Sequence, residues 1–149
     1  MQASIEVRRT PAGPALLLLG AAAACWLLLC TCSFAVTTAH ISSAQLARGY
    51  SQGKAVNPTT TFSPSDRVIH LVVVVGNAPD DTKVGATWYT IDAGASQNEK
   101  LDSASGTLKN GEDHVDLTLS NTANWPRGRY KVDLMLDDKR DRTIDFEVT

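Results

Sequence analysis

Cysteine is absent from the sequence after residue 32, and this absence limits the chemistry of most of the chain. The three cysteines are Cys25, Cys30 and Cys32, and all of them lie within one apolar stretch. The remainder of the chain therefore cannot form a disulfide of its own, whatever its redox compartment. It also cannot build a thiolate metal site or use a cysteine nucleophile.

A strong net charge is missing as well. The formal net charge of the whole chain is −2. Two arginines and one glutamate precede residue 37, so 12 of the 14 basic residues and 15 of the 16 acidic residues follow it, for a net charge of −3. A mildly acidic domain has no general electrostatic attraction to DNA or to anionic lipid. We therefore expect no nucleic-acid partner.

Motifs for catalysis are scarce. The sequence contains no G-x-S-x-G nucleophile turn and no glycine-rich phosphate loop. Its three histidines, His40, His70 and His114, do not have the local spacing of a metal site. The aspartates at 137, 138 and 141 surround an expected hairpin tip without the pattern of a calcium loop. We therefore expect no enzymatic activity, no cofactor and no small-molecule substrate.

Charge is absent altogether from Pro14 to Val36, a run of 23 residues. At about 1.5 Å per residue, a helix of this length spans the roughly 30 Å hydrocarbon core of a bilayer. A buried helix of a globular domain would normally have a polar face, and this run has none. Arg8 and Arg9 precede the run, and no basic residue follows until Arg48. Residues 1–36 are thus predicted to be a cytoplasmic stub plus a transmembrane or signal segment, with the rest of the chain exported.

Three fates of this segment are compatible with the sequence. It stays as a single-pass anchor, which is our first expectation, or it is cut after a small residue such as Ala39. In the third, Cys30 or Cys32 carries a lipid as in bacterial lipoproteins, although Leu29 and Thr31 before them match the lipoprotein signal imperfectly. Both the anchor and the lipid place the protein at the cell membrane.

Residues 37–65 are expected to form a linker with a possible first strand. The stretch "ISSAQLARGY" from Ile41 to Tyr50 does not distinguish a short helix from a strand, because the spacing of its apolar residues does not choose cleanly between a period of 3.6 and a period of 2. The following "SQGKAVNPTTTFSPSD" contains two prolines and many small polar residues, which is typical of a linker or edge loop.

Short strand patterns separated by turn residues fill residues 66–149. "RVIHLVVVV" is β-branched and mostly apolar, "HVDLTLS" alternates, and "KLDSASGT" is a weak pattern that suits a short edge strand before an Asn-Gly turn. Six or seven such strands predict an all-β fold, an antiparallel β-sandwich of the immunoglobulin-like or fibronectin-like type. The N-terminal transmembrane or signal helix precedes it.

The last two strands allow a prediction of register. The residues that we predict to point inward, Tyr130, Val132, Leu134 and Leu136 on one strand and Ile144, Phe146 and Val148 on the other, are all even-numbered. The numbers of opposed residues must therefore sum to an even number if both of these faces are to point inward. A three-residue connection at 137–139 satisfies this rule. The resulting pairs are Leu134–Arg142, Val132–Ile144, Tyr130–Phe146, Lys131–Asp145 and Arg129–Glu147.

The segment "WPRGRY" is typical of the corner that closes such a sandwich. Pro126 fixes a backbone angle, Gly128 permits a turn conformation, and Tyr130 follows at an inward position from which its hydroxyl can bond back across the corner. Trp88 lies on an earlier strand at an inward position, where these sandwiches bury a tryptophan.

Together, "FSPSD", "NAPDDTKVGATWY", "WPRGRYKVDLMLDD" and the final "IDFEV" resemble exported immunoglobulin-like sandwich proteins of bacteria, many of them predicted lipoproteins. The resemblance covers roughly residues 41–149 and concerns structural residues. It implies a fold and an exported location, but it implies no activity and transfers no functional residue.

The basic residues Arg127, Arg129 and Lys131 are the one candidate site for a partner, although we favour cross-strand pairing with Glu147 and Asp145 as the explanation for two of them. We expect a membrane-tethered, extracytoplasmic interaction or accessory module without catalysis, whose partner is a protein of the cell envelope. Two alternatives remain open. One is a metal-carrier or enzyme subunit that uses clustered histidines, and the other is a carbohydrate-binding module that uses exposed aromatic residues such as those at positions 89 and 125.

Overall fold

The computed structural model describes residues 38–149, and every regular element in this range is a β-strand. The expectations for earlier residues, namely the membrane or signal helix and a lipid on Cys30 or Cys32, lie outside the described residues. From residue 38 onward, no helix has the length and apolarity needed to cross a membrane. The strands are β1 (His40–Ser51), β2 (Lys54–Pro58), β3 (Thr61–Phe62), β4 (Val68–Gly76), β5 (Lys83–Ala93), β6 (Ser96–Gln97), β7 (Lys100–Thr107), β8 (His114–Ser120), β9 (Gly128–Leu136) and β10 (Lys139–Val148).

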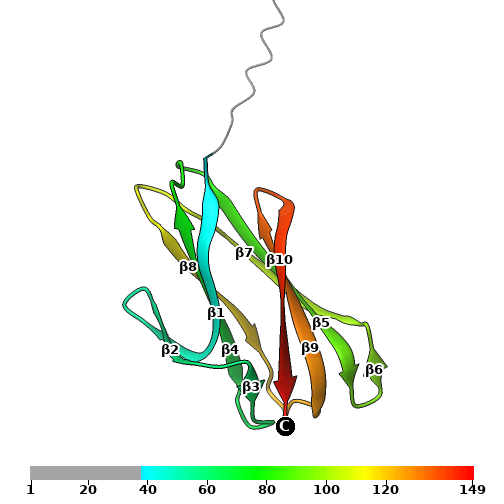
Figure 1. The fold of residues 1–149 in the computed structure, drawn as a ribbon. Coiled ribbons are helices and arrows are strands. Elements are labelled where there is room, and N and C mark those ends of the chain that lie inside the picture. Colours follow the sequence, from blue (N-terminus) through cyan, green and yellow to red (C-terminus); the bar gives the residue numbers. More distant parts are fainter. Residues whose placement is uncertain (1–37) are drawn as a thin grey trace, which may run out of the picture. The chain divides into compact units, whose positions relative to one another are not determined.

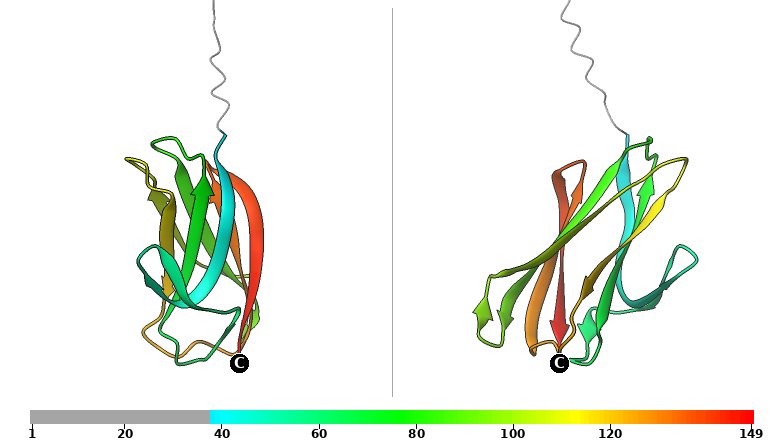
Figure 2. Two further views of the ribbon diagram at one scale, coloured as in Figure 1. Left: turned by 60° about the vertical axis from the view of Figure 1, so that its left-hand side comes forward. Right: turned by 180° about the vertical axis from the view of Figure 1, so that it is seen from behind.

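These strands form two sheets that pack face to face (Figure 1 and Figure 2). The first sheet has the order β2-β1-β4-β8. The second has the order β3-β10-β9-β5, and β6 and β7 both pair with the remaining side of β5. All pairs are antiparallel except the short parallel pair of β3 with β10. The expected all-β antiparallel sandwich is therefore confirmed for residues 38–149.

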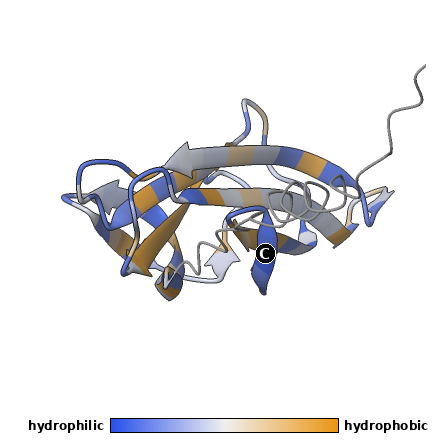
Figure 3. Ribbon diagram, turned by 90° about the horizontal axis from the view of Figure 1, so that it is seen from above, coloured by the Kyte–Doolittle hydropathy of each residue, from blue (hydrophilic) through white to orange (hydrophobic). Residues whose placement is uncertain are grey.

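The core lies between the sheets and consists of the residues that alternation places inward. On β5, Trp88 is fully buried at 0% exposure, and Tyr130 on β9 is 1% exposed. The outer face of the apolar strand β4 is partly covered: its outward Val72 is only 4% exposed, whereas Val68 at its start is 36% exposed. Figure 3 shows polar and apolar residues alternating along the strands, as expected for sheets with one face on the core.

For residues 37–65 the sequence predicts a linker with a possible first strand; that strand is present, but the remainder is not a linker. These residues contain β1, β2 and β3, and β1 pairs with β4 over seven positions from His40 to Ala47. The sandwich therefore begins near residue 40 rather than 66. The side chains of Ile41 and Leu46 are 6% and 3% exposed in the core, so this segment contributes packing energy and is not a spacer. The hairpin of β1 and β2 projects from the body of the sandwich (Figure 1).

The predicted register of β9 and β10 is confirmed, including Val132 opposite Ile144 and Tyr130 opposite Phe146. The connection differs from the expected three residues. Leu136 pairs with Lys139, so the turn contains only Asp137 and Asp138, and a β-bulge between Arg140 and Arg142 supplies the extra residue. Both turn aspartates have positive φ angles, 47° and 63°, as a type I′ hairpin turn requires.

The segment "WPRGRY" forms the corner that the sequence predicts. The Tyr130 hydroxyl donates to the Pro126 carbonyl at 2.6 Å. Gly128 has a φ of +147°, and a Cβ on it would lie 2.1 Å from the Asp92 carbonyl oxygen of β5. Glycine is thus required because β9 begins directly against the β5 backbone. Trp125 is buried, and its indole nitrogen donates to the Asp66 carbonyl at 2.5 Å.

Candidate partner-binding surfaces

The predicted basic cluster lies partly on the outer face of β9. Arg129 and Lys131 have the parity that points away from the core, and Arg127 is exposed in the preceding loop. Lys131 and Arg129 are opposite Asp145 and Glu147 in register, as predicted. Within residues 38–149, however, neither of these opposed pairs comes within ion-pair distance.

The two cations have other neighbours instead. Arg129 Nη2 is 3.7 Å from Asp92 Oδ2, and both side chains are mostly exposed. The Lys131 ammonium lies 5.3 Å from the centre of the Tyr89 ring, as in a cation–π contact. A cavity of about 240 Å³ beside Arg129 is also lined by Asp145 and Glu147. An acidic partner would therefore meet a surface of mixed charge.

The three histidines do not gather in one place. His70 Nδ1 donates to Asp116 Oδ2, and His114 Nδ1 donates to Asp113 Oδ1, both at 2.8 Å. The hydrogen bond from His114 holds the pKa of Asp113 below its usual value. Across residues 38–149, no group of three or more histidine, cysteine, aspartate or glutamate side chains is arranged to hold a metal ion.

The aromatic pair suggested for carbohydrate binding is separated in the structure. Trp125 is 6% exposed and is fixed in the core by its bond to Asp66, so it is not available at the surface. Tyr89 is half-buried on the outer face of β5, next to Lys131. The burial of Trp125 cannot be predicted from strand alternation, because this residue lies in a loop.

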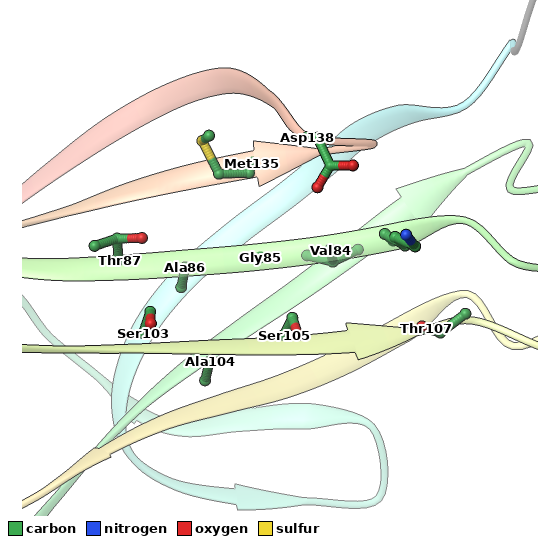
Figure 4. A pocket seen from close by; sticks show the side chains of 11 residues that line it. Val84, Gly85, Ala86, Thr87, Ser103, Ala104, Ser105, Thr107, Met135 and Asp138 are labelled. Carbon is green, nitrogen blue, oxygen red and sulfur yellow. The ribbon is translucent and has the colours of Figure 1, made fainter.

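A groove of about 440 Å³ lies on the outer face of the sheet formed by β7, β5 and β9. Figure 4 shows its walls: Ser103, Ser105 and Thr107 on β7 along one side, and Met135 on β9 along the other. Gly85 on β5 lies between Ser105 and Met135 in register and has no side chain to fill the gap. The groove therefore exists because Gly85, Ser103 and Ser105 have no side chain or only a small one.

One end of this groove carries two opposite charges. Lys83 begins β5, and Asp138 belongs to the hairpin turn beside it. The backbone of Lys83 is held by this turn, because its N–H donates to Asp137 Oδ1 and its carbonyl accepts from the Asp137 N–H, both at 2.9 Å. The sequence signal for the groove is the weak pattern "KLDSASGT", whose small residues by themselves predict only an edge strand.

No family model matches the sequence, and no curated protein is significantly similar to it. Among solved structures, an immunoglobulin-like protein from Pseudomonas aeruginosa matches with a TM-score of 0.53 and 13% identity, over 74% of this chain and 96% of that chain. A DNA-bound alkylpurine DNA glycosylase AlkC from Pseudomonas fluorescens matches with a TM-score of 0.44 and 16% identity, over 74% of this chain and 30% of that chain. The second similarity is too weak to carry information.

The first similarity shows the fold alone. The division of strands, with β1, β4 and β8 in one sheet and β5, β9 and β10 in the other, is the arrangement of immunoglobulin-like sandwiches. The chain thus has an immunoglobulin-like, all-β fold that is also found in a bacterial protein.

Proposed function

We propose that this protein is a non-catalytic interaction module, held at the cell membrane by its N-terminal apolar segment, whose sandwich binds an envelope protein on the extracytoplasmic side. The uncharged run from Pro14 to Val36, preceded by Arg8 and Arg9, supports the tether and its orientation. Whether that segment stays as an anchor or yields to a lipid on Cys30 or Cys32 does not change the role of the sandwich.

The observation that carries the binding role is the groove between β7, β5 and β9. A face of a sheet that stands in water usually carries side chains long enough to cover the backbone, and here Gly85, Ser103 and Ser105 leave it open. Hydroxyl groups, an apolar Met135 and the charged pair at one end provide both polar and apolar contacts. Such a mixed surface suits a protein partner.

Site-specific photocrosslinking in intact cells tests this proposal. Full-length protein carrying benzoylphenylalanine at Thr87, in the groove, is compared with protein carrying it at Gln45, on the outer face of the other sheet. We expect a discrete adduct of higher mass from Thr87, in the membrane fraction, and none from Gln45. A soluble cytoplasmic protein would contradict the tether, and the absence of any Thr87 adduct would contradict binding through this face.

A further inference from the structure

The strand β7 has a long free edge in the second sheet. Among the strands of residues 38–149 it pairs only with β5, and from Ser103 to Thr107 it contains no proline, no charge and no bulge. Proteins usually protect such an edge, because its unpaired N–H and C=O groups are a template for another strand. Among the described strands, the other edges are protected: β2 carries Lys54 and ends at Pro58, whereas β3 and β6 contain only two residues each.

The remaining edge strand, β8, has a neighbour at its first residue. The tip of the β1–β2 hairpin reaches His114, because a Cβ on Gly53 would lie 3.1 Å from His114 Nε2. The ring of Tyr50 lies 6.4 Å from the His114 ring as well. Val115 of β8 packs against β7 at the inward-facing Gly106, where a Cβ would lie 2.6 Å from its side chain. Ser103, Ser105 and Thr107 are all exposed, and no other strand within residues 38–149 pairs with this edge of β7.

The register shows which backbone groups of β7 point outward. Leu108 N–H donates to the Thr82 carbonyl at 2.9 Å, so this pair is a hydrogen-bonded one. Because hydrogen-bonded and non-bonded pairs alternate in an antiparallel ladder, the pairs of Gly106 and Ala104 with β5 are bonded too. The N–H and C=O groups of Ser103, Ser105 and Thr107 therefore point to the free edge.

One of these outward donors is already occupied. Asp102 Oδ1 accepts the Ser103 N–H at 2.7 Å, which also agrees with the outward direction of that group. For Ser105 and Thr107, no hydrogen-bond partner of the edge N–H is found within residues 38–149. The Asp102 carboxylate thus covers the end of a ladder that is otherwise ready to accept a strand.

We propose that an extended segment of a partner protein adds to β7 as a further strand, bonding to Ser105 and Thr107 and directing alternate long side chains over Ser105 into the groove. Strand addition supplies affinity through main-chain bonds and specificity through pockets for alternate side chains. This inference rests on the proposed function and specifies how the groove face would bind.

A different protein fits this edge better than a second copy of the chain. If two β7 strands paired with each other, serine, alanine, glycine and threonine would face the same small residues, and they would bury little apolar area. The groove of about 440 Å³ would remain empty in such a pair. A partner with long side chains at alternate positions fills this space and contacts Met135.

The test uses full-length protein with the Thr87 photocrosslinker in its native membranes and adds substitutions on the edge. Ser105→Pro removes an outward N–H without removing a bond to β5, and Ser105→Ala removes only the hydroxyl. Thr118→Pro is the matched control on β8, where the Val75 bond to the Asp113 carbonyl shows that Thr118 also directs its N–H outward. Asp102→Ala uncovers the Ser103 N–H.

We expect Ser105→Pro to lower the Thr87 adduct at least tenfold, and Ser105→Ala and Thr118→Pro to leave it within twofold. Asp102→Ala should raise the yield, because it adds a donor to the ladder. The segment identified in the adduct, made as a synthetic peptide, should bind purified full-length protein with the same dependence on these substitutions. The rise with Asp102→Ala keeps the test valid even if the proline variant does not fold.

Three results would overturn strand addition. A Thr87 adduct that is indifferent to both Ser105→Pro and Asp102→Ala would leave the proposed function standing and remove the edge from it. Adducts between two copies of the chain would replace the partner by self-association. A peptide from the adduct that does not bind the purified protein would show that the contact at Thr87 is not a strand pairing, whereas the absence of every Thr87 adduct would remove the proposed function itself.

Discussion

Replacing Tyr130 with phenylalanine isolates the hydrogen bond that closes the corner of the sandwich. The ring is 1% exposed and stacks on Phe146 with 5.3 Å between centroids, so phenylalanine retains its packing. Only the bond from the hydroxyl to the Pro126 carbonyl, at 2.6 Å, is lost. A buried hydrogen bond contributes about 1 kcal/mol net, and an acceptor left without a partner costs up to about 2 kcal/mol more. Because Pro126 is exposed and water can reach its surroundings, we expect a loss of about 1–2 kcal/mol in the free energy of unfolding.

Urea denaturation of the full-length protein in detergent, followed by tryptophan fluorescence and near-ultraviolet circular dichroism, measures this loss. Tyr89→Phe is the matched control, because Tyr89 is half-buried on the outer face and is not part of the corner. It should change the free energy of unfolding by less than about 0.5 kcal/mol, as is usual for surface substitutions. Equal effects of the two substitutions would refute the role assigned to the corner.

The same substitution has a consequence at alkaline pH. Burial raises the pKa of the Tyr130 hydroxyl above its ordinary value of 10.0. The folded state then holds this proton more tightly than the unfolded state, so the associated stability is present below about pH 10 and is lost as the pH rises through the folded pKa. The difference in stability between wild type and Tyr130→Phe should therefore shrink above pH 10. A difference that stays constant up to pH 11.5 would contradict the buried, protonated hydroxyl.

Three further substitutions test other parts of the fold. Gly128→Ala should cost about 3 kcal/mol or more in thermal or urea unfolding because its Cβ meets β5 backbone, whereas Gly111→Ala, with a φ of +80° and open space around it, should cost only about 1 kcal/mol. Asp66→Asn should lower the free energy of unfolding by about 1 kcal/mol at pH 7, because the hydrogen bond from the Ser63 N–H stabilises the Asp66 carboxylate and lowers its pKa. This contribution of the carboxylate is present above about pH 4 and is lost as the pH falls through the lowered pKa. At still lower pH the two proteins should be equally stable. Asp138→Gly should increase the free energy of unfolding by about 0.5–1 kcal/mol, since the φ of 63° at this position favours glycine. The increase should be visible as a higher melting temperature.

The register of the last hairpin could be predicted from the sequence, but its turn could not. The requirement that both apolar faces point inward determines only whether opposed residue numbers sum to an even or an odd number. A two-residue turn at Asp137 and Asp138 followed by one bulged residue satisfies that requirement as well as a three-residue turn does. A bulge has no mark of its own in the alternation, because it sits among polar residues at the exposed end of β10.

The first strand was ambiguous for a related reason. A register shift between Ile41 and Ser43 breaks the alternation of β1, so the inward residues Ile41, Ala44 and Leu46 are spaced by three and then by two. That spacing is common to a helix and a strand, and only the pairing with β4 decides between them. Because β4 is distant in sequence, local patterns contain no information about this pairing.

The groove and the free edge were the least predictable parts of the structure, because they result from positions occupied by glycine or by residues with small side chains. Gly85, Ser105 and Met135 belong to three different strands, and they become neighbours only when β7 and β9 pair on either side of β5. The small residues of β7 have weak strand propensity, so the segment is held in place by its ladder with β5, whose Trp88 is fixed in the core. A free strand with little side chain of its own exposes its backbone, and the same residues that weaken the sequence signal for β7 therefore leave its edge open to another chain.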